Sequence, residues 1–523
     1  MSHILTITTF LPLVGMVVLI VGGRALKDDT AKAIALVVTL ATFVVSLAIV
    51  GRFDPAQPGF QMVERADWVE SIGLAYYVGI DGISLWMVIL TTFLFPVAVL
   101  ASWKIEKDVP MYMGAMLLLE TAVVGSFVAL DLLLLFIFFE AILVPMYLLI
   151  GGWGGERRIY AAVKFFLFTM AGSAFLLLAT LFLYSRSGAV LGGGNTFSLP
   201  ALVEVAGALP VATTRWLFLG FFIAFAVKVP VFPLHTWLPD AHTEAPTAGS
   251  VLLAGVLLKV GTYGLIRFNL ALFPDAAKYF ATFVSILAVI GIIYGAVCAL
   301  IQTDIKRLVA YSSVSHLGFV VLGIFAFTQQ GVTGGVLQMV NHGLATGALF
   351  LLVGMVYERT HTRDLGKMGG LASVMPWLTG AFLFAVFASV GLPGLNSFVG
   401  EFLVIIGTFA VSHWFGSLAA LAVILAAIYL LWSYQRMAYG PVHDEHRNLP
   451  DVSLREVVVL APVLALLLVF GVYPKLLTDR IDPATTSVIR HVDPQGQTTD
   501  VGDAKLDLPV SAEVVAAGEG GSE

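Results

Sequence analysis

The chain contains fourteen apolar runs, each long enough to cross a lipid bilayer as a helix. A crossing takes about 20 apolar residues. Only 12% of the 523 residues are charged, whereas a soluble domain has about 25%. The sequence therefore predicts an all-α polytopic membrane protein with about 14 transmembrane helices. The runs lie at residues 4–22, 33–51, 82–103, 111–130, 132–150, 160–184, 214–238, 247–271, 278–300, 308–327, 331–357, 375–411, 416–435 and 456–476.

The basic residues of the loops predict an orientation. Lys and Arg are concentrated in every second loop, beginning with the loop after the first run. By the positive-inside rule, that side is cytoplasmic, and both termini are expected outside. The run that starts at Ile4 has no basic region before it and no small-residue cleavage site after it. We therefore interpret it as the first span and not as a removable signal.

Two of the predicted spans are interrupted. The seventh contains Pro230 and Pro233 and ends at Pro239, and the twelfth contains GLPGLN at residues 391–396. Such breaks free backbone groups that lipid cannot satisfy, so they are tolerated only where they face protein or internal water. The two broken helices are five positions apart in the chain. Because each crossing reverses the direction of the chain, two helices an odd number of crossings apart run in opposite directions through the membrane. This favours two inverted five-helix repeats, helices 4–8 and 9–13, which indicate an ion path; unrelated kinks are the alternative.

This reading divides the chain into five parts. Helices 1–3 occupy residues 1–110, the two repeats occupy 111–271 and 278–435, and helix 14 occupies 456–476. Residues 477–523 are polar and rich in Asp and Glu. A segment of this composition buries little apolar surface, so we expect a mobile tail outside the membrane.

Four ionisable residues are predicted near the middle of spans: Glu140, Lys228, Lys259 and Glu401. A charge at mid-bilayer costs about 2.5–3.5 kcal/mol on insertion scales, so these side chains must face the protein interior. Burial favours the neutral form of such a group, whereas an opposite charge favours the charged form. A buried Glu–Lys pair can therefore lie near the balance at which a proton is bound or released. We predict Glu140 and Lys228 as this pair, Lys259 as the next carrier and Glu401 as the far station; static ion pairs are the alternative.

Three histidines in predicted spans are candidate proton relays, because imidazole exchanges protons near neutral pH. His235 lies in the broken part of the seventh span, His316 in the tenth and His342 in the eleventh. A hydrogen-bonded packing role is the alternative for each. The other histidines, including His242, fall in loops or at helix ends, where solvation is expected.

Other features bear on cofactors and charge. Cys298 is the only cysteine, which excludes a thiolate-held iron–sulfur cluster and an internal disulfide framework. No phosphate-binding or zinc motif occurs, so neither a cofactor nor a metal is expected in this chain. The net charge of −6 gives no support to nucleic-acid binding. Asp131, between the fourth and fifth spans, is expected to cap a helix, with the start of a proton exit as the alternative. Arg267, near the end of the eighth span, is expected to snorkel or pair.

Three segments resemble the antiporter-like subunits of respiratory complex I, the proton-translocating NADH–quinone oxidoreductase. They are KVPVFPLHTWLPDAHTEAPTAGSVLLAGVLLKVGTYGLIRF at residues 228–268, QTDIKRLVAYSSVSHLGF at 302–319 and GLPGLNSFVGEF at 391–402. In that family, L-type and N-type subunits and sodium/proton antiporter subunits typically carry Lys at the position of Glu401. The Glu therefore indicates the M-type branch.

The resemblance implies a translocase subunit of the bacterial inner membrane that moves protons from the cytoplasm to the outside. It implies that Glu140, Lys228, Lys259 and Glu401 form the proton path, with L-type and N-type subunits as neighbours. NADH, FMN, iron–sulfur clusters and quinone would be bound by other subunits. Three other functions stay open: a subunit of a sodium/proton antiporter, a subunit of a membrane-bound hydrogenase, or a scaffold that does not pump.

Overall fold

The computed structural model describes residues 3–57 and 59–494, and thirteen helices in these residues are long and apolar enough to cross a membrane. The remaining predicted span, 375–411, consists of two shorter apolar helices, α17 (Pro376–Val390) and α18 (Asn396–Val411). The prediction of a helical polytopic protein is confirmed. The thirteen are α1 (Ile4–Gly22), α2 (Asp28–Arg52), α3 (Gly82–Ala101), α4 (Val109–Val128), α5 with α6 (Leu132–Ala141, Leu143–Trp153), α7 (Arg158–Leu191), α9 (Val211–Lys228), the rod Thr247–Leu270, α13 (Pro274–Leu300), α14 (Ile305–Ile324), α15 (Gln329–Thr360), α19 (His413–Ala438) and α20 (Leu454–Val472).

The first predicted break lies between α9 and the short helix α10 (Trp237–Glu244). Turns replace the helix between them, and the indole of Trp237 donates to the carbonyl of Val227 at 2.8 Å. This bond satisfies a carbonyl group at the end of α9, as a buried break requires. The rod that follows is composite: α11 (Thr247–Leu252), the π-helical segment η3 (Leu253–Leu257), α12 (Leu258–Gly264) and the π-helical segment η4 (Leu265–Leu270).

The second break separates α17 from α18. Gly391 and Gly394 have φ angles of +81° and +93°, a region that glycine reaches without a steric penalty. At the start of α18, the amide of Asn396 donates to the carbonyl of Asn341 on α15 at 3.1 Å. The amide of Asn341 donates to the carbonyl of Asn396 at 2.8 Å. This exchange fixes the second half of the broken span against α15.

The centre of the molecule is formed by α15 and the rod Thr247–Leu270, whose apolar windows are completely buried. By contrast, α2, α19 and α20 bury about a third or less of theirs, which is typical of helices that face lipid. The contact of α15 with α18 is close because glycines line it. A Cβ atom on Gly407 would lie 2.3 Å from the backbone nitrogen of Gly331, so these two helices meet backbone to backbone.

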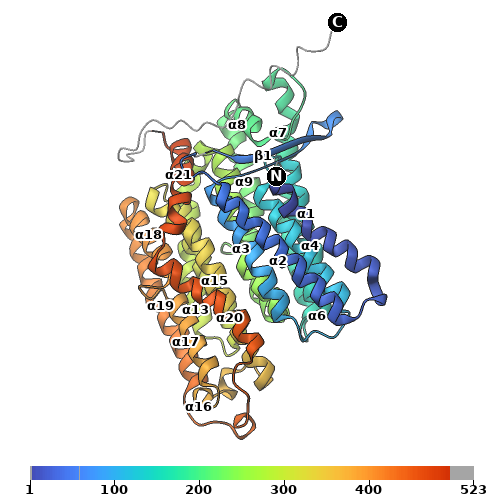
Figure 1. The fold of residues 1–523 in the computed structure, drawn as a ribbon. Coiled ribbons are helices and arrows are strands. Elements are labelled where there is room, and N and C mark those ends of the chain that lie inside the picture. The colour runs from blue at the N-terminus through green and yellow to red at the C-terminus, as the bar shows by residue number, and fades with distance from the viewer. Residues whose placement is uncertain (1–2, 58, 495–523) are drawn as a thin grey trace.

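One end of the bundle, here called the hairpin end, carries elements that lie outside the spans (Figure 1). An antiparallel hairpin pairs β1 (Gln61–Val69) with β2 (Leu74–Ile80). The sequence analysis predicted helices only, so this hairpin is an addition to the predicted fold. The short helix α8 (Leu199–Gly207) lies at the same end.

The expectation of a mobile tail at residues 477–523 is wrong for its first part. Residues 475–492 form helix α21 (Lys475–Val492), which packs against α15, α3 and α13. Its buried residues include Leu477, Ile481 and Ala484, and this spacing places an apolar stripe on one helix face. Residues 495–523 of the predicted tail lie outside the described residues.

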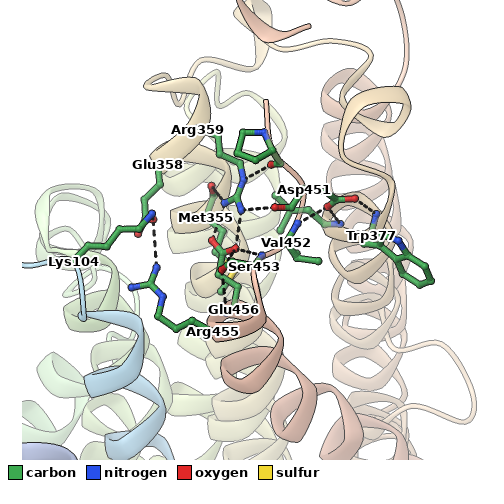
Figure 2. A network of polar contacts seen from close by, with 12 residues as sticks. Lys104, Met355, Glu358, Arg359, Trp377, Asp451, Val452, Ser453, Arg455 and Glu456 are labelled. Carbon is green, nitrogen blue, oxygen red and sulfur yellow. Dashed lines mark hydrogen bonds and ion pairs between the residues drawn. The ribbon is translucent and has the colours of Figure 1, made fainter. Parts of the chain in front are cut away.

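The opposite end is held by a network that we call the clamp, formed by Lys104, Glu358, Arg359, Asp451, Arg455 and Glu456 (Figure 2). Arg359 at the end of α15 donates to both carboxylate oxygens of Glu456 on α20, at 2.8 and 2.7 Å. Asp451 accepts from the backbone nitrogens of Trp377 and Leu378 at 2.9 and 3.0 Å. The clamp therefore ties α15, α17 and α20 together.

Candidate functional site

Lys259 is completely buried on α12, directly after the π-helical segment η3. Its ammonium group donates to the carbonyl of Ala254, five residues earlier, and lies 2.7 Å from Nδ1 of His342 on α15. π-helical segments interrupt the regular hydrogen-bond ladder and occur frequently at functional sites. The local backbone thus supplies one partner of the ammonium group, and the facing histidine supplies the other.

His316 and Glu401 form a second buried pair. Nδ1 of His316 on α14 lies 2.8 Å from Oε1 of Glu401 on α18, and both side chains are about 4% exposed. The amide of Gln338 on α15 donates to the same carboxylate oxygen at 2.9 Å. The break at 391–395 brings backbone next to this carboxylate, since a Cβ atom on Gly391 would lie 3.2 Å from Oε2 of Glu401.

The two pairs are neighbours, because the ring centroids of His316 and His342 are 5.9 Å apart. Lys259, His342, His316 and Glu401 therefore form a row of polar groups that crosses from α12 past α15 and α14 to α18. We call these four residues the central line. The structure brings together four of the seven predicted site residues.

Glu140 and Lys228 lie beside each other without contact. Lys228 is the last residue of α9, and its ammonium nitrogen lies 4.5 Å from the ring centroid of Phe139, the residue before Glu140. The ion pairs of the described residues do not include Glu140 with Lys228. Among the described residues, neither the Lys228 nitrogen nor Oε1 of Glu140 has a hydrogen-bond partner.

His235 lies in the first break, as predicted, with its ring centroid 5.7 Å from that of Phe232 and 5.2 Å from that of Tyr294. Its Nδ1 has no hydrogen-bond partner within residues 3–57 and 59–494. None of its described ring contacts or hydrogen bonds joins it to the central line. His235 is therefore buried in the first break and is not part of the central line.

The sequence analysis did not identify every buried ionisable group, and Glu120 and His242 are two examples. Glu120 on α4 is completely buried, and neither of its carboxylate oxygens has a hydrogen-bond partner among the described residues. His242 was expected in solvent, but it is completely buried in α10 and stacks on Phe350 with 4.7 Å between ring centroids. Glu120 lies at the centre of the predicted span 111–130, so the rule applied to Glu140 would have identified it. His242 lies between Asp240 and Glu244 in a polar stretch, so only the packing of α10 reveals its burial.

Arg267 and Asp131 take the expected structural roles. The Arg267 guanidinium, at the hairpin end of η4, pairs with Asp81, the N-cap residue of α3. Asp131 caps α5 by accepting from the backbone nitrogens of Leu133 and Leu134 at 2.9 and 3.0 Å. Burial raises the pKa of Asp131 to about 6, although these hydrogen bonds oppose the rise.

Comparisons with known proteins identify the family of the chain. Residues 129–428 match the family described as "NADH:quinone oxidoreductase/Mrp antiporter, TM", and residues 7–126 match "NADH-ubiquinone oxidoreductase chain 4, amino terminus". NADH-quinone oxidoreductase subunit M of Rhodobacter capsulatus is 48% identical over 94% of this chain and 97% of its own length. The subunit M of Mycobacterium tuberculosis is 41% identical over 93% and 94%.

Solved structures show the same relationship. A chain of respiratory complex I from Thermus thermophilus superposes with a TM-score of 0.84 at 32% identity, over 93% of this chain and 99% of that chain. A chain of an Mrp complex from a Dietzia species superposes with a TM-score of 0.78 over 98% and 54%, but its identity of 24% shows the fold alone.

Proposed function

The chain belongs to the antiporter-like, proton-translocating membrane subunits of NADH–quinone oxidoreductase, and on this premise we propose that the central line carries its protons. The observation that carries the proposal is the row from Lys259 through His342 and His316 to Glu401, in which only the step between the two imidazole rings has no hydrogen bond. Ionisable groups inside a membrane are costly and mark ion paths by default. The step between the two imidazole rings is short enough for a ring rotation or one bridging water to complete it.

We propose that Glu140 and Lys228 load the central line. Both have an unpartnered polar atom in the part of the chain that the structure describes, so either can form a new bond without first breaking one. A charge that approaches from a neighbouring subunit would shift the proton between them, because electrostatic interactions are strong in a dry interior. L-type and N-type subunits are the proposed neighbours. NADH, FMN, iron–sulfur clusters and quinone would act in other subunits of the translocase.

The proposed direction is from the cytoplasm to the outside. The clamp end then faces the cytoplasm of a bacterial inner membrane, and both termini lie outside, as the loop charges predict. The two breaks, between α9 and α10 and between α17 and α18, support the proposed inverted repeats 111–271 and 278–435. Each proposed half contributes one broken span beside the path, as in transporters that work by inverted repeats.

Neutralising Glu140 tests this function. Inverted membrane vesicles with Glu140→Gln, in which a native gel shows the assembled complex, are assayed for NADH-driven proton uptake and NADH oxidation with quinone. We expect both rates to collapse, because the amide binds no proton at neutral pH. Glu70→Gln is the matched control, since Glu70 is exposed next to the hairpin. Wild-type rates in the assembled Glu140→Gln complex would contradict the proposal, and loss of assembly alone would favour a scaffold.

A further inference from the structure

The rod that carries Lys259 also carries two further polar residues toward the hairpin end. Tyr263 follows Lys259 by four residues, and Arg267 follows Tyr263 by four. Residues four apart lie on the same face of a helix, and eight residues rise about 12 Å at 1.5 Å each. The most direct way from the central line to the hairpin end therefore runs along this face, past Tyr263 and Arg267.

Aromatic rings and one ion pair fill this route. Tyr263 is 1% exposed and packs against Phe127 and Phe268, with ring centroids 5.4 and 6.3 Å apart. The Arg267 guanidinium carbon lies 5.7 Å from the centroid of the Tyr263 ring and 4.6 Å from that of the Phe60 ring. The aromatic groups thus lie on both sides of the guanidinium, and its hydrogen bond goes to Asp81.

Asp81 is itself fixed in place. Its carboxylate accepts from the backbone nitrogens of Ile83 and Ser84 at 3.2 and 2.9 Å and from the Ser84 hydroxyl at 2.9 Å. This capping box holds the carboxylate at the start of α3, where the helix dipole also favours a negative charge. The Arg267 side chain is therefore anchored to a rigid partner.

A cavity lies on the far side of Arg267. It measures about 400 Å³ including its open mouth and is lined by Arg267, Phe60 and His491, with apolar side chains from α8 and α21. Nε of Arg267 is buried without a hydrogen-bond partner in residues 3–57 and 59–494. Arg267 thus has the cavity on one side, while Tyr263, and behind it Lys259, lie further along the rod.

We propose that Arg267, anchored by Asp81 and backed by Tyr263, is a seal that prevents protons from passing between Lys259 and the outside. The guanidinium keeps its positive charge at any physiological pH. A guanidinium that stays protonated and is held in an ion pair with Asp81 neither accepts nor releases a proton, so a proton cannot be relayed across this position. The cavity is then the outer vestibule in front of the seal. A proton on Lys259 leaves toward His342 because the direct way out is closed.

This inference deepens the proposed function, because it takes its orientation and the role of Lys259 from it. It also explains why protons would follow the central line. Without a barrier at Arg267, a proton driven back by the membrane potential would reach Lys259 directly from the outside. Pumping would then be short-circuited at the middle of the molecule. Replacing Arg267 is therefore expected to cause a proton leak, whereas replacing a residue of the central line is expected to abolish pumping.

The test measures the passive leak in the intact complex. Purified complex with Arg267→Gln is reconstituted in liposomes, a pH gradient is imposed without NADH, and its decay is followed with a trapped dye. We expect the decay through the complex to be about tenfold faster than in the wild type, which corresponds to a barrier lowered by about 1.4 kcal/mol. Arg267→Lys keeps the positive charge and should remain tight. An assembled Arg267→Gln complex with the wild-type decay rate would overturn the seal.

A second measurement does not depend on a change at Arg267. Ala271→Cys places a thiol in the wall of the cavity, and Val260→Cys places one beside Lys259, both in a Cys298→Ser background. A membrane-impermeant maleimide added from outside should react with Cys at position 271 and not at 260; equal reactivity, or none at 271, would contradict the vestibule. Neither readout uses NADH, so a failure here is distinct from a failure of the Glu140→Gln test.

Discussion

The clamp and the central line both bring basic residues against Glu carboxylates, and they differ in how completely their polar groups are paired. At the clamp, Arg359 donates to two carboxylate oxygens of Glu456 and to the carbonyls of Pro450 and Asp451. In and beside the central line, Nε2 of His316, Nε2 of His342 and the Lys228 nitrogen have no partner among the described residues. A buried polar atom without a partner costs about 1–3 kcal/mol. Full pairing fixes a charge in place, whereas incomplete pairing leaves it able to exchange partners and protons.

The largest effect is expected at the middle of the line. Lys259→Arg retains a positive charge, but a guanidinium does not release its proton, so NADH-driven proton uptake should fall about as far as in Lys259→Met. Both variants are measured in vesicles that contain the assembled complex. If Lys259→Arg pumps normally while Lys259→Met does not, Lys259 is a fixed charge like Arg359, and the comparison fails.

At the clamp we expect a loss of stability without a loss of coupling. Arg359→Met leaves the Glu456 carboxylate buried and unpaired, and breaking a buried pair costs about 3–5 kcal/mol. The yield of assembled complex and its thermal midpoint should fall, while the protons moved per NADH in the surviving complex stay at the wild-type value. Arg447→Met removes an exposed pair with Asp444 and should change neither. A reduced proton ratio in Arg359→Met would place the clamp on the proton path.

Glu120 tests this comparison further, because it is buried like the central line but has no hydrogen bond to it or to any other described residue. Glu120→Leu removes a polar group whose burial costs about 1–3 kcal/mol, so we expect a higher thermal midpoint of the complex and unchanged pumping. Glu120→Gln retains a buried polar group and should not stabilise. Reduced pumping in both variants, with assembly intact, would instead make Glu120 a further proton station.

The smallest effect is expected at the outer surface of the hairpin end. Asp482 on α21 accepts a hydrogen bond from Thr333 at 2.8 Å, and burial raises its pKa above the ordinary value, with Asp479 adding to the rise and the bonds from Thr333 and Gln329 opposing it. A raised pKa means that α21 docks most tightly at acid pH and loosens as pH rises through the raised pKa. Hydrogen exchange of α21 should show this slope, and Asp482→Asn should remove it. An unchanged slope in the variant would assign it to another group.

The contacts that join Lys259 to Glu401 through the two histidines are visible only in the structure. Sequence alone could predict the number of spans, both breaks and the burial of Lys259 and Glu401. These follow from strong constraints, because lipid tolerates neither free backbone groups nor single charges. The approach of Glu140 to Lys228 through Phe139 could not be predicted, since it depends on side-chain positions on two different helices. The π-helical segments beside Lys259 have no signature in composition.

The hairpin and α21 were missed for a different reason. A search for spans detects only long apolar segments. The hairpin strands have 9 and 7 residues and are too short, and α21 is apolar on one face only. In α21, Asp479 and Asp482 lower the mean hydropathy of the segment. The apolar stripe of Leu477, Ile481 and Ala484 would have been found by a search for apolar residues at helical spacing.

The position of α21 at the end of the described chain has a consequence for how the protein is made. A Cβ atom on Gly82 would lie 1.7 Å from the carbonyl oxygen of Arg480, so α21 lies directly on the first residue of α3. Its other main partner, α15, is also synthesised long before it. Every crossing can therefore be inserted before α21 is made, and the part of the hairpin end that α21 covers stays open until then. A ribosome that stops early would leave a protein with all its spans and an open end, which a protease could distinguish from the finished chain.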